Sequence, residues 1–150
     1  MRIGVISDTH GLLRPEALAA LAGVEQVIHA GDIGGLQVLT GLGQLAPVTA
    51  VAGNIDLGQE WSASLAEQQR LELAGWQILL VHDRAQVDQP ADVDLVIYGH
   101  SHRPQWQRHE TVHWLNPGSA GRRRFTLPVS LAILELNGAT INVNFVDLLA

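Results

Sequence analysis

Short apolar runs alternate with amphipathic segments through the first 54 residues, and this alternation is the strongest constraint on the fold. Strands with their following loops are predicted at 2–6, 25–32 and 47–54, with helices at 15–23 and 34–45 between them. A β-α-β-α-β order requires parallel strands joined by right-handed crossovers. The first third of the chain therefore predicts a parallel sheet with helices packed on it.

The second half changes to a hairpin pattern. A buried strand is predicted at 92–100, and Asn137 with Gly138 is expected to supply the positive φ angles of a tight turn. Three segments read as β-hairpins around turn residues: 68–83, 105–116 and 129–148. The predicted fold class is α/β (an α+β sandwich), with two packed mixed β-sheets flanked by helices in one domain covering 1–150.

Composition narrows the range of functions. The 150 residues are 47% hydrophobic and include no cysteine, so disulfides, zinc fingers and thiol nucleophiles are excluded. A formal net charge of -6 argues against an extensive nucleic-acid surface, which needs a basic stripe. The first apolar run is too short for a signal peptide, and none approaches the roughly 20 residues of a membrane span. A cytoplasmic protein without membrane association is expected.

Polar residues with metal-binding side chains follow five of the predicted strands. Ligands in open α/β sheets bind outside the carboxyl ends of the strands, so these residues are expected to converge on one site. Carboxylates, imidazoles and an amide form a metal-ligand set without thiolates, and seven ligands are too many for one tetrahedral ion. A pair of metals with a shared bridge is therefore predicted. The seven residues are Asp8, His10, Asp32, Asn54, His82, His100 and His102.

Spacing within the set supports the same interpretation. Two ligand pairs are separated by one residue, so in extended backbone their side chains face the same way. Three candidate ligands are each preceded by glycine, which permits the close backbone approach of a crowded centre: Gly31, Gly53 and Gly99. A single strand-end aspartate usually caps a turn, and a single histidine is usually structural. The ordered set as a whole, rather than any one member, indicates a metal centre.

Five motifs in this order resemble the calcineurin-like metallophosphoesterase family across essentially the whole chain. They are "ISDTHGLL", "IHAGDI", "AGNID", "GHSHRP" and "NPGS", and they look most like the small bacterial and archaeal phosphodiesterase branch. The resemblance implies two mixed sheets and a dinuclear centre. It implies two divalent metal ions, with Mn²⁺ expected first and Ni²⁺, Fe or Zn²⁺ as alternatives.

Residue roles follow from the same resemblance. Asp32 would bridge the two metals, because a carboxylate has two oxygens to share. Asp32, Asn54 and His82 are expected to take part in catalysis. One metal would be held by Asp8, His10, Asp32 and His102, and the other by Asp32, Asn54, His82 and His100.

The function implied is a metal-dependent phosphodiesterase that attacks a phosphate diester with a hydroxide activated by the dinuclear centre. A phosphomonoesterase with the same site is the alternative, because the sequence does not show the shape of the pocket. A non-catalytic scaffold of the same fold is disfavoured, since all seven positions hold residues able to bind a metal.

Two positions depart from the family pattern. Many members carry histidine after the asparagine, where it can protonate the leaving group, but this chain has Ile55. We therefore expect weaker activity on esters with poor leaving groups, with Asp56 read as a turn or cap residue. Asp83 stands where glycine is common, and the segment 83–92 is short where relatives insert a helix. These departures bear on the substrate more than on metal binding.

The substrate is expected to be a small phosphate ester, with a nucleotide-like molecule as one option and a homodimer as a possible assembly. Asn54 is a candidate substrate contact beside its metal role. Three consecutive arginines leave two interpretations open, a solvated loop or a fork on a substrate phosphate: Arg122, Arg123 and Arg124.

Other histidines and the tryptophans are read as structural. His29 lies inside a strand and is expected to be buried, whereas His109 and His113 in a hairpin are expected at the surface. Packing in the core or at a subunit interface is expected for Trp61, Trp76, Trp106 and Trp114.

Overall fold

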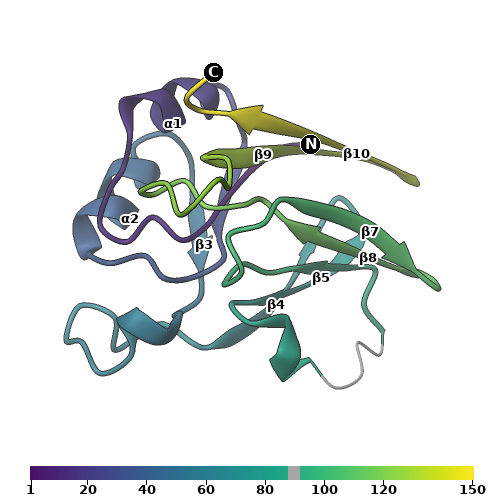
Figure 1. Ribbon diagram of the computed structural model, residues 1–150. Helices are drawn as coiled ribbons and strands as arrows, with labels where there is room; N and C mark the ends of the chain where they lie inside the picture. The colour runs from purple at the N-terminus through teal and green to yellow at the C-terminus, as the bar shows by residue number, and fades with distance from the viewer. Residues whose placement is uncertain (88–91) are drawn as a thin grey trace.

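Two five-stranded β-sheets stacked as layers form the body of the protein (Figure 1). The structure is a computed structural model that describes residues 1–87 and 92–150. Its elements are β1 (Arg2–Ile6), α1 (Pro15–Ala20), β2 (Gln26–His29), α2 (Leu36–Gly43), β3 (Val48–Ala50), the 3₁₀ helix η1 (Asn54–Asp56), β4 (Gln68–Leu73), β5 (Trp76–Val81), the 3₁₀ helix η2 (Arg84–Gln86), β6 (Leu95–Ile97), β7 (Gln105–His109), β8 (Val112–Asn116), β9 (Ser130–Asn137) and β10 (Thr140–Asp147).

Sheet A has the strand order β10-β9-β1-β2-β3. Strands β1, β2 and β3 are parallel, as the alternating pattern of the first third predicted. The C-terminal hairpin β9–β10 then adds antiparallel strands next to β1. The last strands of the chain therefore complete the sheet that its first strand begins.

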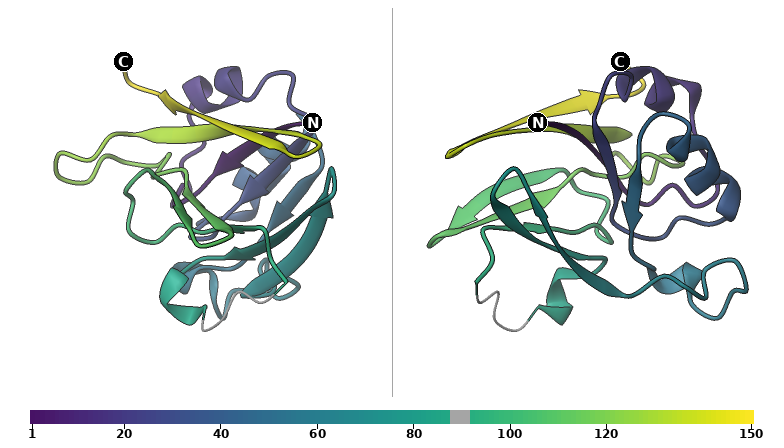
Figure 2. Two further views of the ribbon diagram at one scale, coloured as in Figure 1. Left: turned by 90° about the vertical axis from the view of Figure 1, so that its right-hand side faces the viewer. Right: turned by 180° about the vertical axis from the view of Figure 1, so that it is seen from behind.

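Sheet B has the order β4-β5-β6-β8-β7 and is also mixed. Strands β5, β6 and β8 are parallel, while β4 and β7 pair antiparallel with β5 and β8 at the two edges. The predicted architecture of two packed mixed sheets is confirmed, and Figure 2 shows the sheets as separate layers from the side and from behind.

The main apolar core lies between the two sheets. Side chains of sheet A such as Val5 and Ile28 meet side chains of sheet B such as Leu80 and Ile97, all fully buried. A second core lies between the other face of sheet A and the helices α1 and α2. Leu42 of α2 and Leu21, directly after α1, are buried in it. Strands β1 and β2 are thus covered on both faces, which explains why they read as nearly continuous apolar runs.

The predicted flanking helices are α1 and α2, which both cover sheet A. The outer face of sheet B is covered instead by its own cluster, in which the Arg84 guanidinium lies 4.7 Å from the Trp114 ring and 5.2 Å from the Tyr98 ring. Residues 88–91 of the short segment 83–92 lie outside the described residues.

Several predicted helices and strands were longer than the observed ones. Helix α1 ends at Ala20 rather than residue 23, and α2 begins at Leu36, after two glycines that are poor helix formers. Strands β3 and β6 have three residues each, because the backbone leaves the sheets early to form the loops that follow. Those loops carry candidate ligands, so the site begins where the regular pairing ends.

The C-terminal hairpin turns one residue later than predicted. Asn137 pairs with Thr140, so the two turn residues are Gly138 and Ala139. Gly138 supplies a positive φ of 61°, but Asn137 is a strand residue and does not. A two-residue loop with glycine first matches the hairpin turns that favour strand twist. Among the described residues, no helix has the length and apolar character needed to cross a membrane.

Candidate metal centre

Backbone hydrogen bonds bring together the loops after β1 and β2. Asp8 N donates to Gly31 O and His10 N donates to Asp32 O, each at 3.0 Å. The two loops therefore run side by side beyond the strand ends. This pairing places the first D-x-H motif beside the aspartate of the second strand, as the convergence argument predicted.

The loops from sheet B join the same place. Gly99 N donates to His82 O at 2.9 Å, which ties the end of β6 to the end of β5. His100 N donates to Asp8 Oδ2 at 3.1 Å, which ties sheet B to the loop after β1. Candidate ligands from four strands of two sheets are thus connected by their own backbones.

Asp8 is fully buried, and its two oxygens have different surroundings. Oδ2 accepts hydrogen bonds from Ser7 Oγ at 2.8 Å and from the His100 N–H. Oδ1 is buried with no hydrogen-bond partner. Three imidazole Nε2 atoms lie near it: His102 at 3.3 Å, His82 at 3.8 Å and His10 at 3.9 Å. One oxygen fixes the carboxylate and the other faces the histidines.

Asp32 lies between histidines that the family resemblance assigns to different metals. Its Oδ2 is 3.4 Å from Nε2 of His10 and 3.4 Å from Nε2 of His82, while Oδ1 accepts from the Ile55 N–H at 3.2 Å. Burial on its own raises the pKa of Asp32. The nearby imidazole of His82, with the Ile55 N–H and His10, outweighs burial and lowers the pKa to about 2. This position suits a bridging carboxylate.

His82 is held in the orientation of a metal ligand. Its Nδ1 donates to Ala30 O at 2.7 Å, so the neutral ring carries its lone pair at Nε2. That Nε2 is buried with no hydrogen-bond partner and faces Asp8 and Asp32. Burial lowers the pKa of His82, but the neighbouring carboxylates of Asp32 and Asp8 and the Ala30 carbonyl outweigh it and raise the pKa overall.

The cluster fits divalent metal ions. Buried polar atoms normally have partners, so the unpartnered Asp8 Oδ1 and His82 Nε2 are the atoms that a cation would satisfy. Within the described residues, two triads have donor atoms lying within 4.8 Å of one another, and Asp8 belongs to both. The triads are Asp8–His10–His102 and Asp8–Asp32–His82.

Two predicted ligands lie further out. The His100 ring is 5.3 Å from the His82 ring at an interplanar angle of 84°, and His100 Nε2 is 3.9 Å from Asp83 Oδ2. Asn54 is exposed at the start of η1, directly before the residue that donates to Asp32. Neither residue is part of the two triads, so their roles as ligands stay predictions.

Candidate ligands adopt a backbone conformation that most residues avoid. A left-handed φ costs a residue with a Cβ roughly 1–2 kcal/mol, and such strain concentrates at functional sites. Five of the seven candidates have φ between 48° and 72°: Asp8 (55°), His10 (48°), Asp32 (55°), His100 (72°) and His102 (63°). The strain of these loops is compensated by packing and hydrogen bonds that aim the side chains at one another.

Glycines before the ligands allow this close packing. A Cβ on Gly53 would lie 2.2 Å from Asp32 Oδ1, and a Cβ on Gly99 would lie 2.2 Å from Ser7 Oγ. No real Cβ sits this near another atom, so any side chain here would displace Asp32 or the Ser7–Asp8 pair. The glycine pattern seen in the sequence therefore has a steric cause.

Asp56 has the structural role that its position predicted. The carboxylate is fully buried and accepts three backbone N–H bonds of 3.0 Å each, from Ile33, Gly34 and Gly53. Two of these donors directly follow Asp32 and the third directly precedes Asn54. Asp56 therefore joins two ligand loops, and its carboxylate is buried among backbone N–H groups.

Asn116 is a supporting residue that the sequence argument missed. Its Nδ2 donates to Gly99 O and Ser101 Oγ at 3.1 Å, and its Oδ1 accepts from Gly118 N. It thus braces the loop that carries His100 and His102. The "NPGS" motif includes this asparagine and could have drawn attention to it. A family resemblance, however, does not show which groups the asparagine side chain would hydrogen-bond.

The arginine segment borders the metal cluster. A cavity of about 210 Å³ is lined by two candidate ligands and three arginines: His10, His102, Arg122, Arg123 and Arg124. All three arginines are exposed at its rim. Of the two interpretations left open by the sequence, this placement favours a substrate contact.

His29 is buried in the predicted structural role. Its Nδ1 accepts from the Gly31 N–H at 3.1 Å, so its Nε2–H donates to Thr9 Oγ1 at 3.0 Å. The Thr9 hydroxyl in turn donates to Ile33 O. Burial lowers the pKa of His29 to about 4, which keeps the ring neutral.

The prediction for His113 was wrong, while His109 is exposed as expected. The His113 ring stacks on Trp106 at 5.2 Å and meets Trp76 edge-on at 5.8 Å, with its Nδ1 buried. Alternation along β8 does not reveal that two tryptophans cover this face. Packing is the observed role of all four tryptophans, since Trp114 is buried and Trp61, Trp76 and Trp106 pack against the apolar cores.

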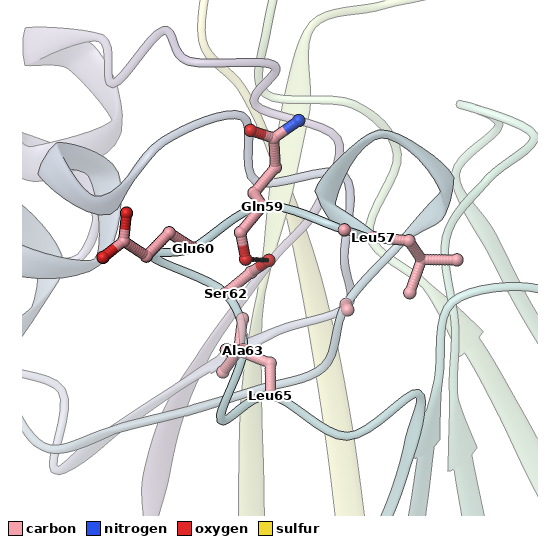
Figure 3. Close-up of a pocket in the computed structure, with 8 residues that line it drawn as sticks. Leu57, Gln59, Glu60, Ser62, Ala63 and Leu65 are labelled. Atoms are coloured by element: carbon pink, nitrogen blue, oxygen red, sulfur yellow. Dashed lines mark hydrogen bonds between the residues drawn. The ribbon is translucent and has the colours of Figure 1, made fainter.

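A second cavity, of about 450 Å³, lies in the loop after η1 (Figure 3). Ala52 and loop residues between Leu57 and Leu65 line it, and none of the seven candidate ligands does. Inside the loop, Ser62 Oγ donates to Gln59 O at 3.1 Å. The Glu60 carboxylate extends away from that hydrogen bond. This cavity is separate from the metal cluster.

The fold and the cluster define a class: two-sheet α/β proteins with a carboxylate and imidazole metal site at the strand ends. Residues 1–139 match the calcineurin-like phosphoesterase superfamily domain, and the chain belongs to this superfamily. The predicted resemblance is thereby confirmed. Membership implies divalent metal ions, and the donor set described above is suited to them.

Individual relatives agree with this membership. A probable metallophosphoesterase of Methanothermobacter thermautotrophicus is 34% identical over 97% of this chain and 92% of that protein. An archaeal phosphodiesterase structure has a TM-score of 0.80 at 26% identity, covering 97% of this chain and all of that chain. Vps29 of Entamoeba histolytica, solved in complex with Zn²⁺, has a TM-score of 0.77 at 26% identity, with 99% of both chains covered.

Proposed function

We propose that this chain is a phosphodiesterase that hydrolyses a small phosphate diester at a dinuclear metal centre. The observation that carries the proposal is the pair of buried, unpartnered donor atoms, Asp8 Oδ1 and His82 Nε2, facing each other across the cluster at 3.8 Å. Mn²⁺ is the expected metal, with Ni²⁺, Fe and Zn²⁺ as alternatives that the same donors accept.

Two divalent ions at such a site supply a hydroxide at neutral pH and polarise the phosphoryl oxygens. The protein's part is to hold the ligands and the substrate. Asp32 would bridge, supported by its equal 3.4 Å distances to His10 and His82. His82 would bind through Nε2, supported by its Nδ1–H bond to Ala30. Asn54 would complete the set beside the substrate.

Ile55 limits the esters that such a site handles well. Ile55 is 42% exposed and its side chain cannot donate a proton, and the nearby Asp56 is fully buried and accepts three backbone N–H bonds. General acid catalysis contributes typically 10²–10⁴-fold where a leaving group is basic. We therefore expect faster turnover of esters whose leaving groups depart as stable anions.

A phosphomonoesterase remains the alternative within this superfamily, and a non-catalytic scaffold the alternative outside catalysis. The test is turnover of bis-p-nitrophenyl phosphate against p-nitrophenyl phosphate by metal-stripped protein, with each metal added back singly. Diester preference restored by Mn²⁺ supports the proposal. Monoester preference would favour the alternative enzyme, and no turnover with any metal would favour the scaffold.

Location and assembly belong to the proposal as well. We expect a cytoplasmic enzyme, which cell fractionation would test. A homodimer is expected, and light scattering of the purified chain would distinguish it from a monomer near 16.2 kDa.

A further inference from the structure

Residues 119–121 are anchored beside the metal cluster, directly before the three arginines. Ala120 N donates to Ser7 O and Ser119 Oγ donates to Asp8 O, each at 3.0 Å. Arg14 donates to Gly121 O through Nε at 3.3 Å and Nη2 at 3.2 Å. A Cβ on Gly121 would lie 2.6 Å from Asp8 O, so the backbones are in contact. The residues that follow are therefore positioned by the cluster itself.

Three arginines follow this anchored segment, and their guanidinium groups have no acidic partner among the described residues. Within residues 1–87 and 92–150, no carboxylate lies within 4.0 Å of Arg122, Arg123 or Arg124. They share the 210 Å³ cavity with His10 and His102. Since the chain as a whole is acidic, with a net charge of -6, three unpaired cations beside a phosphoesterase site form a local anion-binding surface.

The next residue supplies an exposed aromatic ring. Phe125 is 92% exposed, the largest exposed fraction among the large hydrophobic residues described. Its φ of 52° is a genuine outlier for a bulky side chain. Packing in a core does not explain an exposed phenyl ring on a residue with a positive φ. A ring beside a phosphate-binding surface suits stacking of a nucleobase, which contributes roughly 1–3 kcal/mol per base.

Ile55 restricts the leaving group on the same site. A leaving alkoxide needs a proton, but a leaving phosphate monoester does not, because its second pKa is about 6. The negative charge that develops on such a group would be stabilised by arginine hydrogen bonds. The missing acid and the surplus arginines therefore point to the same kind of substrate.

We propose that the substrate is a pyrophosphate-linked nucleotide, whose departing nucleoside monophosphate is held by Arg122–Arg124 with its base on Phe125. This inference rests on the proposed function. In the reaction, water adds to one phosphorus and the bond from that phosphorus to the bridging oxygen breaks. The bond's electron pair stays on the bridging oxygen, which leaves as part of the nucleoside monophosphate. The protons of the added water pass to solvent, and two phosphate monoesters result.

The test compares two substrates in the metal-loaded protein: diadenosine diphosphate, and bis-p-nitrophenyl phosphate, which has one phosphate and no base. The variant R122Q/R123Q/R124Q is expected to lower kcat/KM for diadenosine diphosphate about 100-fold, as loss of charge-assisted hydrogen bonds implies. Its kcat/KM for bis-p-nitrophenyl phosphate, which lacks the second phosphate, should fall at least about tenfold less. F125S should lower the diadenosine value about tenfold through KM.

R108Q is the matched control, because Arg108 is an exposed arginine on β7 whose one hydrogen bond among the described residues is to Glu110 O. It should leave both substrates within about twofold of wild type. Near-UV circular dichroism verifies that each variant is folded. An equal fall for both substrates in the triple variant would overturn the inference.

A binding measurement separates this inference from the proposed function. Calorimetry with α,β-methylene adenosine diphosphate, which cannot be hydrolysed at that bond, should show binding that weakens about 100-fold in the triple variant. Turnover of bis-p-nitrophenyl phosphate without any turnover of diadenosine diphosphate would overturn this inference alone. If no diester is turned over, the proposed function fails, and arginine-independent binding of the analogue would overturn the inference too.

Discussion

Asp8 shows at the scale of one residue how a site is prepared for a cation. Its Oδ2 is fixed by Ser7 and the His100 N–H, and its Oδ1 is left without a partner among three imidazoles. An unpartnered buried carboxylate oxygen costs stability when no cation is bound. The protein therefore gives up stability at this position in order to bind a metal.

Asp8→Asn should reveal that cost directly. The amide keeps the acceptor at the Oδ2 position and places an NH₂ donor opposite the histidine nitrogens. We expect the variant to be more stable than wild type in chelator by about 1–2 kcal/mol. Thermal unfolding with and without Mn²⁺ checks this, and the metal-induced rise in Tm should disappear. A variant that is less stable in chelator, yet still stabilised by Mn²⁺, would contradict the role given to Oδ1.

His29 predicts a pH dependence of folding. Burial lowers its pKa from 6.5 to about 4. Between these two pH values, His29 is therefore protonated in the unfolded chain but mostly neutral in the folded protein. Stability is therefore full above pH 6.5 and declines as the pH falls towards 4, by about 3 kcal/mol from this residue.

The measurement is the free energy of unfolding against pH for wild type and His29→Gln, both in chelator. Glutamine can keep the hydrogen bonds to Gly31 and Thr9 but does not titrate. The stability difference between the two proteins should shift by about 3 kcal/mol between pH 7 and pH 4 in favour of the variant. Parallel curves would show that His29 is not buried as a neutral ring.

At the scale of elements, the short strands provide rigid ends and the strained loops present the candidate ligands. Strands β3 and β6 have three residues each, and the loops beyond the strands present the ligands in left-handed conformations. Glycines such as Gly53 allow the loops to touch. Geometry at the cluster is thus set by loop packing against rigid strand ends.

Gly53→Ala tests this with little other disturbance. Its φ of -93° is open to alanine, so the effect would come from the clash of the new Cβ with Asp32, 2.2 Å from its Oδ1 and 2.3 Å from its backbone nitrogen. We expect Mn²⁺ affinity to fall at least about tenfold, since a candidate metal ligand is displaced. Gly43→Ala in α2 is the control, because a Cβ there meets nothing within 4 Å. Equal affinities for the two variants would contradict the steric role of Gly53.

The sequence predicted these elements unevenly. Hairpins around Gly75 and Glu110 were read correctly because alternation and turn residues are local. The turn at Gly138 was displaced by one residue, and β3 and β6 were made too long, because apolar residues continue past the last pair into the site. His113 was misplaced because its cover comes from tryptophans on two different hairpins.

At the scale of the whole molecule, the two sheets share one core. Side chains from both sheets make up the cluster around Ile28, Leu80 and Ile97, and the metal site is built from the ends of both. We therefore expect a single cooperative unfolding transition in denaturant, with circular dichroism and tryptophan fluorescence giving the same midpoint. Two separate transitions would show that the sheets fold independently.

The convergence of five candidate ligands, Asp8, His10, Asp32, His82 and His102, could be predicted from sequence, because parallel strands end at one edge of a sheet. The cavity beside Arg122 could not, because it depends on hydrogen bonds from Ala120 and Arg14 to residues far away in the chain. The free Oδ1 of Asp8 was likewise invisible, since it is defined by which partners are missing.

The most direct test of the account is a titration of metal-stripped protein with Mn²⁺, in which bound metal and turnover of bis-p-nitrophenyl phosphate are followed together. Ligands shared around Asp8 and Asp32 predict binding that saturates at two ions per chain, with turnover reaching its plateau at the same point. Saturation at one ion, or two bound ions without diester turnover, would contradict a dinuclear phosphodiesterase centre.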